Sequence, residues 1–379
     1  MTRALYCCLL ALAASASFAG DSNAPAQQRD SRTDSALEKA LKSYPQSDAN
    51  GDGILTISEA RAAQKKLLGE SASSQPSGEA ALAARKLARA SVEPAPDCPT
   101  PTFADVAYGP HERNILDFWQ AKSDSATPVV VFIHGGGFVN GSKEKVRATP
   151  KVLKECLAHG VSFAAINYRY RTQTSLPEVL RDTARAIQFL RTKAGEWNLD
   201  KTRFASYGGS AGAGSSLWLG FHEDLADPDN PDPVLRESSR LSVIGANSCQ
   251  CTYDVQRWRE ILGPPPSNMA PQGEASSRGV RNPDDLGVPE AQEDRADLDM
   301  LGMLTADDPP VYLYSKLPNT PPTDRNHYVH HPKHAIAVKE KCDQLGVESA
   351  LILADTVLPE GKTPEMVMLE FFFKHLKVQ

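Results

Sequence analysis

The sequence predicts an α/β fold: a three-layer sandwich in which helices cover both faces of a mostly parallel central sheet, preceded by a small helical segment. Three observations predict it. Apolar runs alternate with helical patterns after about residue 102, and an acidic loop lies between two helical patterns near the N-terminus. With 379 residues and 41% hydrophobic content, the chain can form one large domain of about 250 residues and a smaller unit.

The alternation places the strands and helices of the large domain. Short apolar runs bounded by turn residues are typical of buried strands, and the amphipathic stretches between them connect parallel neighbours. A stretch at 262–305 breaks the alternation and is rich in proline, glycine and acidic residues, so we interpret it as an irregular insertion and a candidate lid. The expected strands lie within 128–136, 161–170, 202–210, 241–248, 309–315 and 347–355, and the expected helices within 147–160, 176–197, 211–225, 334–346 and 365–377.

The first 19 residues have the pattern of a secretory signal peptide. Arg3 supplies a basic start, an apolar stretch follows, and Ser17 and Ala19 form a small-x-small cleavage site. No later segment approaches about 18 uninterrupted apolar residues, so we expect no membrane span and a secreted or periplasmic protein. The expected organisation is a signal peptide at 1–19, a tether at 20–34, a helical segment at 35–69, a linker at 70–101 and the large domain at 102–379.

Charge and cysteine content argue against a nucleic-acid-binding surface and against a cysteine-based metal site. A net charge of −6 provides no basic surface for nucleic acid, which is therefore not an expected partner. Two of the seven cysteines lie in the signal peptide, and the remaining odd number leaves at least one thiol without an internal disulfide partner. Cys249 and Cys251 have no matching Cys/His pair at a zinc spacing, so we expect no metal there.

Residues 48–59 match the EF-hand loop pattern D-x-[DN]-x-[DN]-G-x5-E, with helical patterns on both sides. Short oxygen-bearing side chains suit a hard cation, and Gly53 permits the sharp turn in the loop. Only one such loop is visible, which favours a structural Ca²⁺ site over a sensor. The expected ligands are Asp48, Asn50, Asp52, the carbonyl of Ile54, Thr56 through water, and Glu59.

A candidate nucleophile lies in "SYGGSAGAG", where Ser210 occupies the centre of a G-x-S-x-G spacing. An apolar run precedes it and a stretch able to form a helix follows, which is the strand-turn-helix setting that a nucleophile elbow requires. Gly208 and Gly212 are expected to be needed because the sharp turn leaves no room for side chains.

A second glycine-rich motif strengthens this interpretation. "HGGGF" follows an apolar strand, and its amides at Gly135 and Gly136 can form an oxyanion hole with that of Ala211. His134 is expected to order this loop through a hydrogen bond rather than to act as the general base.

Taken together, "HGGGF", "NYRY", "GGSAG" and "DDPPVYLY" resemble the α/β-hydrolases of the hormone-sensitive-lipase-like and feruloyl-esterase-like groups. The similarity covers roughly residues 102–379, and an EF-hand ahead of such a domain resembles a group of exported bacterial proteins. The resemblance implies ester hydrolysis through an acyl-enzyme, a small-molecule or glycan ester as substrate, and no organic cofactor.

The chain departs from this pattern at the general base. In such hydrolases the acid follows the "PPVYLY" strand and the histidine follows the next strand, but here "TVLPEGKTPEMVMLEFFF" contains no histidine. The loop after "PPVYLY" carries four histidines, of which His330 and His331 are the candidates for the base. Asp324 is the expected acid, with Asp254 as the alternative.

The sequence is compatible with three functional hypotheses. The first is an exported serine esterase acting on small or carbohydrate-linked esters, supported by the elbow and the oxyanion motif together. The second is a degenerate, non-catalytic binding protein of the same fold, supported by the missing histidine. The third is a calcium-dependent adhesion or assembly module, supported by the EF-hand loop alone.

Overall fold

The computed structural model of the chain divides into two units, residues 1–86 and 87–379, and each is described by itself. The predicted signal peptide, nearly all of the tether, residues 70–93 of the linker, most of the helical patterns beside the loop 48–59, and the centre of the candidate lid lie outside the described residues. No helix in the described parts of the chain is long and apolar enough to cross a membrane. The described residues are 32, 41–42, 48–56, 59, 94–266 and 295–378.

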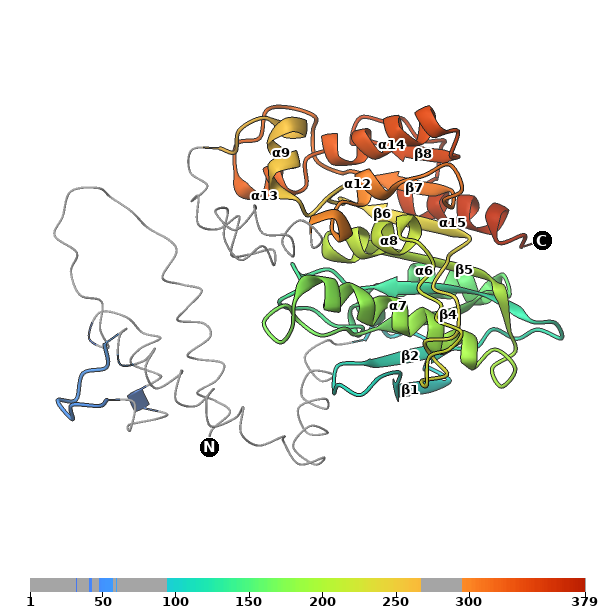
Figure 1. Cartoon of the computed structure of the whole chain (residues 1–379), viewed down its shortest axis with the longest axis horizontal. Coiled ribbons are helices and arrows are strands. Elements are labelled where there is room, and N and C mark those ends of the chain that lie inside the picture. The colour runs from blue at the N-terminus through green and yellow to red at the C-terminus, as the bar shows by residue number, and fades with distance from the viewer. Residues whose placement is uncertain are drawn as a thin grey trace. The chain divides into compact units, whose positions relative to one another are not determined.

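The second unit is built on one eight-stranded sheet in the order β1-β2-β4-β3-β5-β6-β7-β8 (Figure 1). The pairs β1–β2 and β2–β4 are antiparallel, and all other neighbours are parallel. The mostly parallel sheet predicted from the sequence is therefore confirmed. The strands are β1 (Phe103–Ala107), β2 (Ile115–Trp119), β3 (Thr127–Ile133), β4 (Ser162–Ile166), β5 (Leu199–Gly209), β6 (Val243–Asn247), β7 (Val311–Tyr314) and β8 (Ser349–Ile352).

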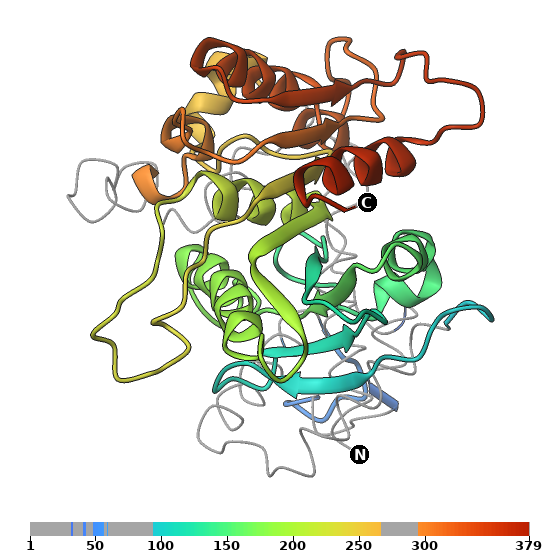
Figure 2. The ribbon, with the colours of Figure 1, turned by 90° about the vertical axis from the view of Figure 1, so that its right-hand side faces the viewer.

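Helices cover both faces of the sheet, as the alternation predicted (Figures 1 and 2). One face is covered by α6 (Lys151–Ala158) and α15 (Pro364–His375), and the other by α7 (Leu176–Thr192), α8 (Ala211–Phe221) and α14 (Lys333–Leu345). The short helices are α5 (Lys145–Ala148), α9 (Val255–Leu262), α12 (Met300–Met303) and α13 (Arg325–Val329).

The two faces of the sheet carry separate apolar cores. Successive side chains of β3 point to opposite faces, so Val129 and Val131 join the core under α7 and α8, while Val130 joins the core under α6 and α15. All three are fully buried, which explains why these strands are uninterrupted apolar runs in the sequence. The packing fixes the carboxyl ends of β3, β5, β6 and β7 along one edge of the sheet.

Candidate active site

Ser210 lies at a strained turn between β5 and α8. Its backbone has φ 54° and ψ −118°, a region that residues other than glycine rarely occupy. Its N–H donates to the carbonyl of Asn247 at the end of β6, 2.9 Å away, which ties the turn to the neighbouring strand. This is the geometry of a nucleophile elbow, in which the serine side chain stands above the carboxyl end of the sheet.

Gly208 and Gly212 make the turn sterically possible. A Cβ atom at Gly208 would lie 2.3 Å from the carbonyl oxygen of Ile133, and one at Gly212 would lie 2.0 Å from the same oxygen. Both distances are far below van der Waals contact, so any side chain would push α8 away from β3. The close approach explains both glycines of the motif.

His330 is the histidine that reaches the serine. Its Nε2 lies 2.8 Å from Ser210 Oγ, and the residue forms the C-cap of α13 in the segment after β7. Its Nδ1 faces two oxygens of Asn326, the backbone carbonyl at 3.1 Å and Oδ1 at 3.0 Å. Because a carbonyl oxygen can only accept, Nδ1 carries the proton in the neutral ring. Nε2 is thereby left to accept the proton of Ser210.

The remaining predicted partners lie elsewhere. His331 is turned away, since its Nε2 faces the carbonyl of Thr320 at 2.8 Å and its Nδ1 accepts from the N–H of Lys333. Asp324 is the N-cap of α13 and accepts from the N–H of His327 at 2.8 Å, so it does not orient His330 as predicted. Its alternative, Asp254, pairs with Arg295 at 2.6 Å.

The place expected for an acid is filled by Asn326, which no sequence motif predicted. Asn326 and His330 are four residues apart at the start and end of α13, a spacing that puts two side chains on the same helix face. The sequence contained this spacing, but it became informative only once α13 was known to be a helix.

Burial and nearby cations keep His330 neutral. Burial lowers its pKa below the ordinary 6.5, the carbonyl of Asn326 opposes this, and Lys316 and Arg325 lower the pKa further. A lowered pKa means that the ring loses its proton at a lower pH and remains able to accept one from Ser210.

We therefore expect activity to persist below the pH at which an ordinary histidine becomes protonated. In a profile of kcat/KM measured from about pH 5 to 8, the acid limb should lie below 6.5. Arg325→Gln removes a cation near the ring and should move that limb to higher pH. A limb above 6.5 in the unsubstituted protein would contradict this assignment of the base.

The predicted oxyanion-hole residues surround the serine. A Cβ atom at Gly135 would lie 3.6 Å from Ser210 Cβ and 2.4 Å from the carbonyl oxygen of Gly209. Gly136 has φ 124°, and within the described residues its N–H donates no hydrogen bond. Ala211 contributes the first N–H of α8, which has no partner inside the helix. All three residues thus lie beside Ser210.

The "NYRY" residues hold the "HGGGF" loop in place. Tyr168 stacks on the ring of His134 at 4.2 Å, and its hydroxyl donates to the carbonyl of His134 at 2.6 Å. The hydroxyl of Tyr170 donates to the carbonyl of Gly141, and the guanidinium of Arg113 lies 3.7 Å above the Tyr170 ring. Burial lowers the pKa of His134 to about 3, so this ring stays neutral and orders the loop.

Ser210 lies between two cavities that share only Ser210 and Gly136. The cavity that also contains His330 has a volume of about 390 Å³ and is mostly apolar on its walls. Its remaining lining side chains are Phe138, Val139, Asn140, Arg171, Leu176, Ala211, Gln250, Tyr253, Trp258, Arg325 and Val329.

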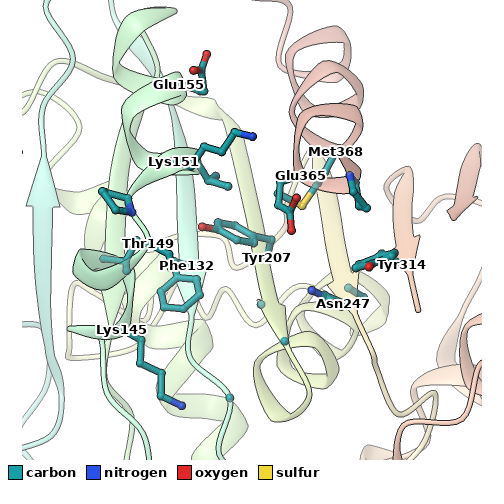
Figure 3. A pocket seen from close by; sticks show the side chains of 18 of the residues that line it. Phe132, Lys145, Thr149, Lys151, Glu155, Tyr207, Asn247, Tyr314, Glu365 and Met368 are labelled. Atoms are coloured by element: carbon teal, nitrogen blue, oxygen red, sulfur yellow. The ribbon is translucent and has the colours of Figure 1, made fainter. Parts of the chain in front are cut away.

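The second cavity, of about 980 Å³, lies over the sheet between α6 and α15. Figure 3 shows Tyr207 and Phe132 on its floor, Lys151 on the α6 side, and Glu365 and Met368 on the α15 side. The larger volume leaves room for a bulky substituent next to the serine, but only the smaller cavity joins the serine to its histidine.

Known proteins resemble this domain in fold. The BD-FAE family profile matches residues 116–246. A truncated carbohydrate esterase from gut microbiota aligns with a TM-score of 0.58 at 19% identity, over 75% of this chain and 99% of that one. A thermophilic esterase from Thermogutta terrifontis aligns with a TM-score of 0.52 at 16% identity, over 73% and 96%. The domain has the α/β-hydrolase fold.

Curated relatives of this α/β-hydrolase domain share part of its sequence. A probable carboxylic ester hydrolase, LipM, of Mycobacterium tuberculosis is 34% identical over 168 residues, which is 42% of this chain and 37% of the relative. A probable isoprenylcysteine alpha-carbonyl methylesterase of Arabidopsis thaliana is 28% identical over 139 residues, 36% and 29% of the two chains. The chain thus spans about a third of the length of these two relatives.

The predicted calcium loop lies in the first unit. Asp48 accepts hydrogen bonds from the N–H groups of Gly51 and Gly53 at 2.9 and 2.8 Å. Glu59 accepts from the N–H and hydroxyl of Thr56, which lowers its pKa. Across the described part of the chain, no three acidic, histidine or cysteine side chains converge as a metal cluster. The carboxylates of Asp48 and Glu59 therefore accept hydrogen bonds from N–H groups of the loop itself.

Proposed function

We propose that this protein is an exported serine esterase that cleaves small or carbohydrate-linked carboxylic esters. The observation that carries the proposal is the 2.8 Å contact between Ser210 Oγ and His330 Nε2. It occurs at a strained elbow, with glycine amides beside it. The names of the relatives, a carboxylic ester hydrolase and a carbohydrate esterase among them, support the same reaction class.

The arrangement supports a two-step mechanism. Ser210 attacks the ester carbonyl while His330 Nε2 takes its proton, and the oxyanion is stabilised by the amides of Gly135, Gly136 and Ala211. The imidazolium then gives the proton to the departing alcohol, leaving an acyl group on Ser210. In the second step, His330 activates a water molecule that attacks the acyl carbonyl. The carboxylic acid leaves and Ser210 regains its proton.

The competing hypothesis was a degenerate protein that binds without cleaving. It rested on the absence of a histidine after the strand 347–355, and His330 supplies an imidazole from a different loop. The esterase proposal is tested by steady-state hydrolysis of p-nitrophenyl acetate and butyrate by the chain from residue 20 onward. Saturable turnover is expected, and rates equal to buffer alone on all short esters would favour the binding protein.

Asn326 is proposed as the positioning residue for His330. Asn326→Leu should reduce kcat about 10- to 100-fold, because Nδ1 loses one of its two acceptors and the ring loses its orientation. Asn326→Asp should restore most of the rate, and its negative charge should raise the pKa of His330 and move the acid limb to higher pH. A purely structural role for Asn326 would leave the position of that limb unchanged.

We also propose export through the N-terminal signal and Ca²⁺ binding by the loop 48–59. The short oxygen-bearing side chains fit a hard cation, and Glu59 lies close enough to the N–H of Asn50 and to the Asp48 carboxylate for both to affect its pKa. When bound, Ca²⁺ would fix the fold of this segment without a role in the chemistry.

Calorimetric titration of the chain from residue 20 onward should reveal one Ca²⁺ site with a dissociation constant of about 10⁻⁴ to 10⁻³ M. Glu59→Gln should weaken binding at least about tenfold, because it removes the bidentate carboxylate. Glu112→Gln, an exposed acid in the other unit, is the matched control and should bind as the unsubstituted chain does. No heat of binding at millimolar Ca²⁺ would contradict the proposal.

A further inference from the structure

Arg113 reaches the "HGGGF" loop from the antiparallel side of the sheet. It lies in the turn between β1 and β2, is half-buried, and its N–H donates to His111 Nδ1 at 3.1 Å. Its guanidinium donates through Nε to the carbonyl of Tyr168 at 2.7 Å and through Nη2 to the carbonyl of Gly141 at 3.3 Å. The same Nη2 lies 3.4 Å from His134 Nε2. One side chain thus contacts the start and the end of the loop and the segment that follows β4.

These contacts decide which nitrogen of His134 carries the ring proton. A guanidinium can only donate hydrogen bonds, so His134 Nε2 accepts from Arg113. The proton of the neutral ring therefore lies on Nδ1, which donates to the carbonyl oxygen of Gly135 at 2.8 Å. Burial lowers the pKa of His134 to about 3, so the fully buried ring stays in this neutral form. Arg113 and the carbonyl of Gly135 thus select the same tautomer.

The hydrogen bond to Gly135 also sets the direction of the next amide. The carbonyl of Gly135 and the N–H of Gly136 belong to one planar peptide unit and point in opposite directions, so fixing the carbonyl fixes the N–H. Among the described residues this N–H has no acceptor, and Gly136 lines both cavities that meet at Ser210. Gly141 packs against the same hydrogen bond, since a Cβ atom there would lie 2.3 Å from the Gly135 oxygen and 2.7 Å from His134 Nδ1.

We propose that Arg113 is a positioning residue: through His134, it holds the amide of Gly136 in the direction that the oxyanion requires. This inference rests on the proposed ester hydrolysis and assigns a role to the turn between β1 and β2. An amide stabilises an oxyanion best when it is already in place, because reorientation during the reaction costs part of the stabilisation. Arg113 suits this task, since its charge does not change near neutral pH and its planar fork holds three acceptors at once.

Arg113→Gln should reduce kcat on p-nitrophenyl butyrate about 10- to 100-fold and change KM less than about threefold, because the oxyanion exists only after the ester has been attacked. The inhibition constant of trifluoroacetophenone, which forms a tetrahedral oxyanion on the serine, should rise by the same factor as kcat/KM falls. Rates are taken per active site, counted by fluorophosphonate labelling to completion. A mere loss of folded protein would lower the number of sites and leave the inhibition constant unchanged.

A double-mutant cycle tests whether Arg113 acts through His134. His134→Asn removes the acceptor at Nε2, so in that background Arg113→Gln should reduce kcat further by less than about threefold. Arg185→Gln is the matched control, because this half-buried guanidinium donates to the carbonyl of Tyr108 in the same turn at 3.0 Å and pairs with Asp232. The control should keep kcat within about twofold of the unsubstituted chain.

Three results would overturn the inference while the esterase proposal stands. The first is full kcat in Arg113→Gln, the second is a pair of losses that multiply in the double variant, and the third is an unchanged inhibition constant where kcat falls. Absence of turnover by the unsubstituted chain on all short esters would overturn both.

Discussion

Ser210→Ala is expected to reduce kcat by at least about 10⁴-fold on any ester that the protein cleaves. The reason is that no other nucleophile is activated at the elbow. Among the residues that the structure describes, only Ser210 combines a side-chain oxygen 2.8 Å from an imidazole with adjacent backbone amides. Residual hydrolysis would come from the oxyanion amides and substrate binding alone. Steady-state assays with purified variants provide the measurement.

Two further variants make this result specific. Ser210→Gly should lose activity to the same extent while relieving the backbone strain, because glycine tolerates φ 54°. Ser242→Ala, at a serine whose hydroxyl donates to the carbonyl of Thr202, should keep full activity. Retention of more than about a hundredth of the rate in Ser210→Ala would show that another residue performs the attack.

His330→Asn is expected to reduce kcat by about 10³- to 10⁵-fold, because it removes the base while leaving the nucleophile in place. Ser210 then keeps its proton and remains a weak nucleophile near neutral pH. The measurement is the same assay, together with the thermal midpoint to confirm that the variant is folded.

The neighbouring histidine provides a matched control. His331→Asn removes an imidazole one residue away that contacts Thr320 and Lys333 rather than Ser210. We expect the loss of these two hydrogen bonds to lower the free energy of unfolding by about 2 kcal/mol, with kcat reduced less than about threefold. A large loss of kcat in His331→Asn with little effect in His330→Asn would reverse the assignment.

Local patterns in the sequence were sufficient to predict much of the fold. The apolar runs within β3 to β8 predicted a parallel sheet, because strands covered on both faces contain few polar residues. The first two strands were missed: β1 and β2 pair antiparallel at one side of the sheet, and the buried Asp117 interrupts the apolar run of β2. Phe103–Ala107 is also half-exposed, so it forms no clear apolar run.

The candidate site, too, could be predicted from the sequence only in part. Ser210 and the glycines around it were predictable because the elbow is encoded within a few consecutive residues. The partner of the serine was not fixed, because His330 is 120 residues away and its approach depends on how the segment after β7 folds. Sequence order favoured Asp324 as the acid, but that residue caps α13, where a short carboxylate satisfies a helix N–H. The neutral Asn326 had no charge to mark it.

The site contains the predicted serine and glycines, but its histidine, His330, lies in a segment other than the one where the resemblance places it. The base comes from the segment after β7, and both the base and its orienting residue lie on one short helix. Because α13 also carries Arg325, which lowers the pKa of His330, the orientation and the pKa of the proposed base both depend on this one helix. Substitutions in α13 should therefore change the rate and its pH dependence together.

The central claim is that His330 activates Ser210. Its most direct test is the rate of covalent labelling by a fluorophosphonate, with the modified residue located by mass spectrometry of the digested protein. The account predicts a single label on Ser210, formed at least about a hundredfold more slowly in His330→Asn than in His331→Asn. A label on another residue, or equal rates in the two histidine variants, would contradict it.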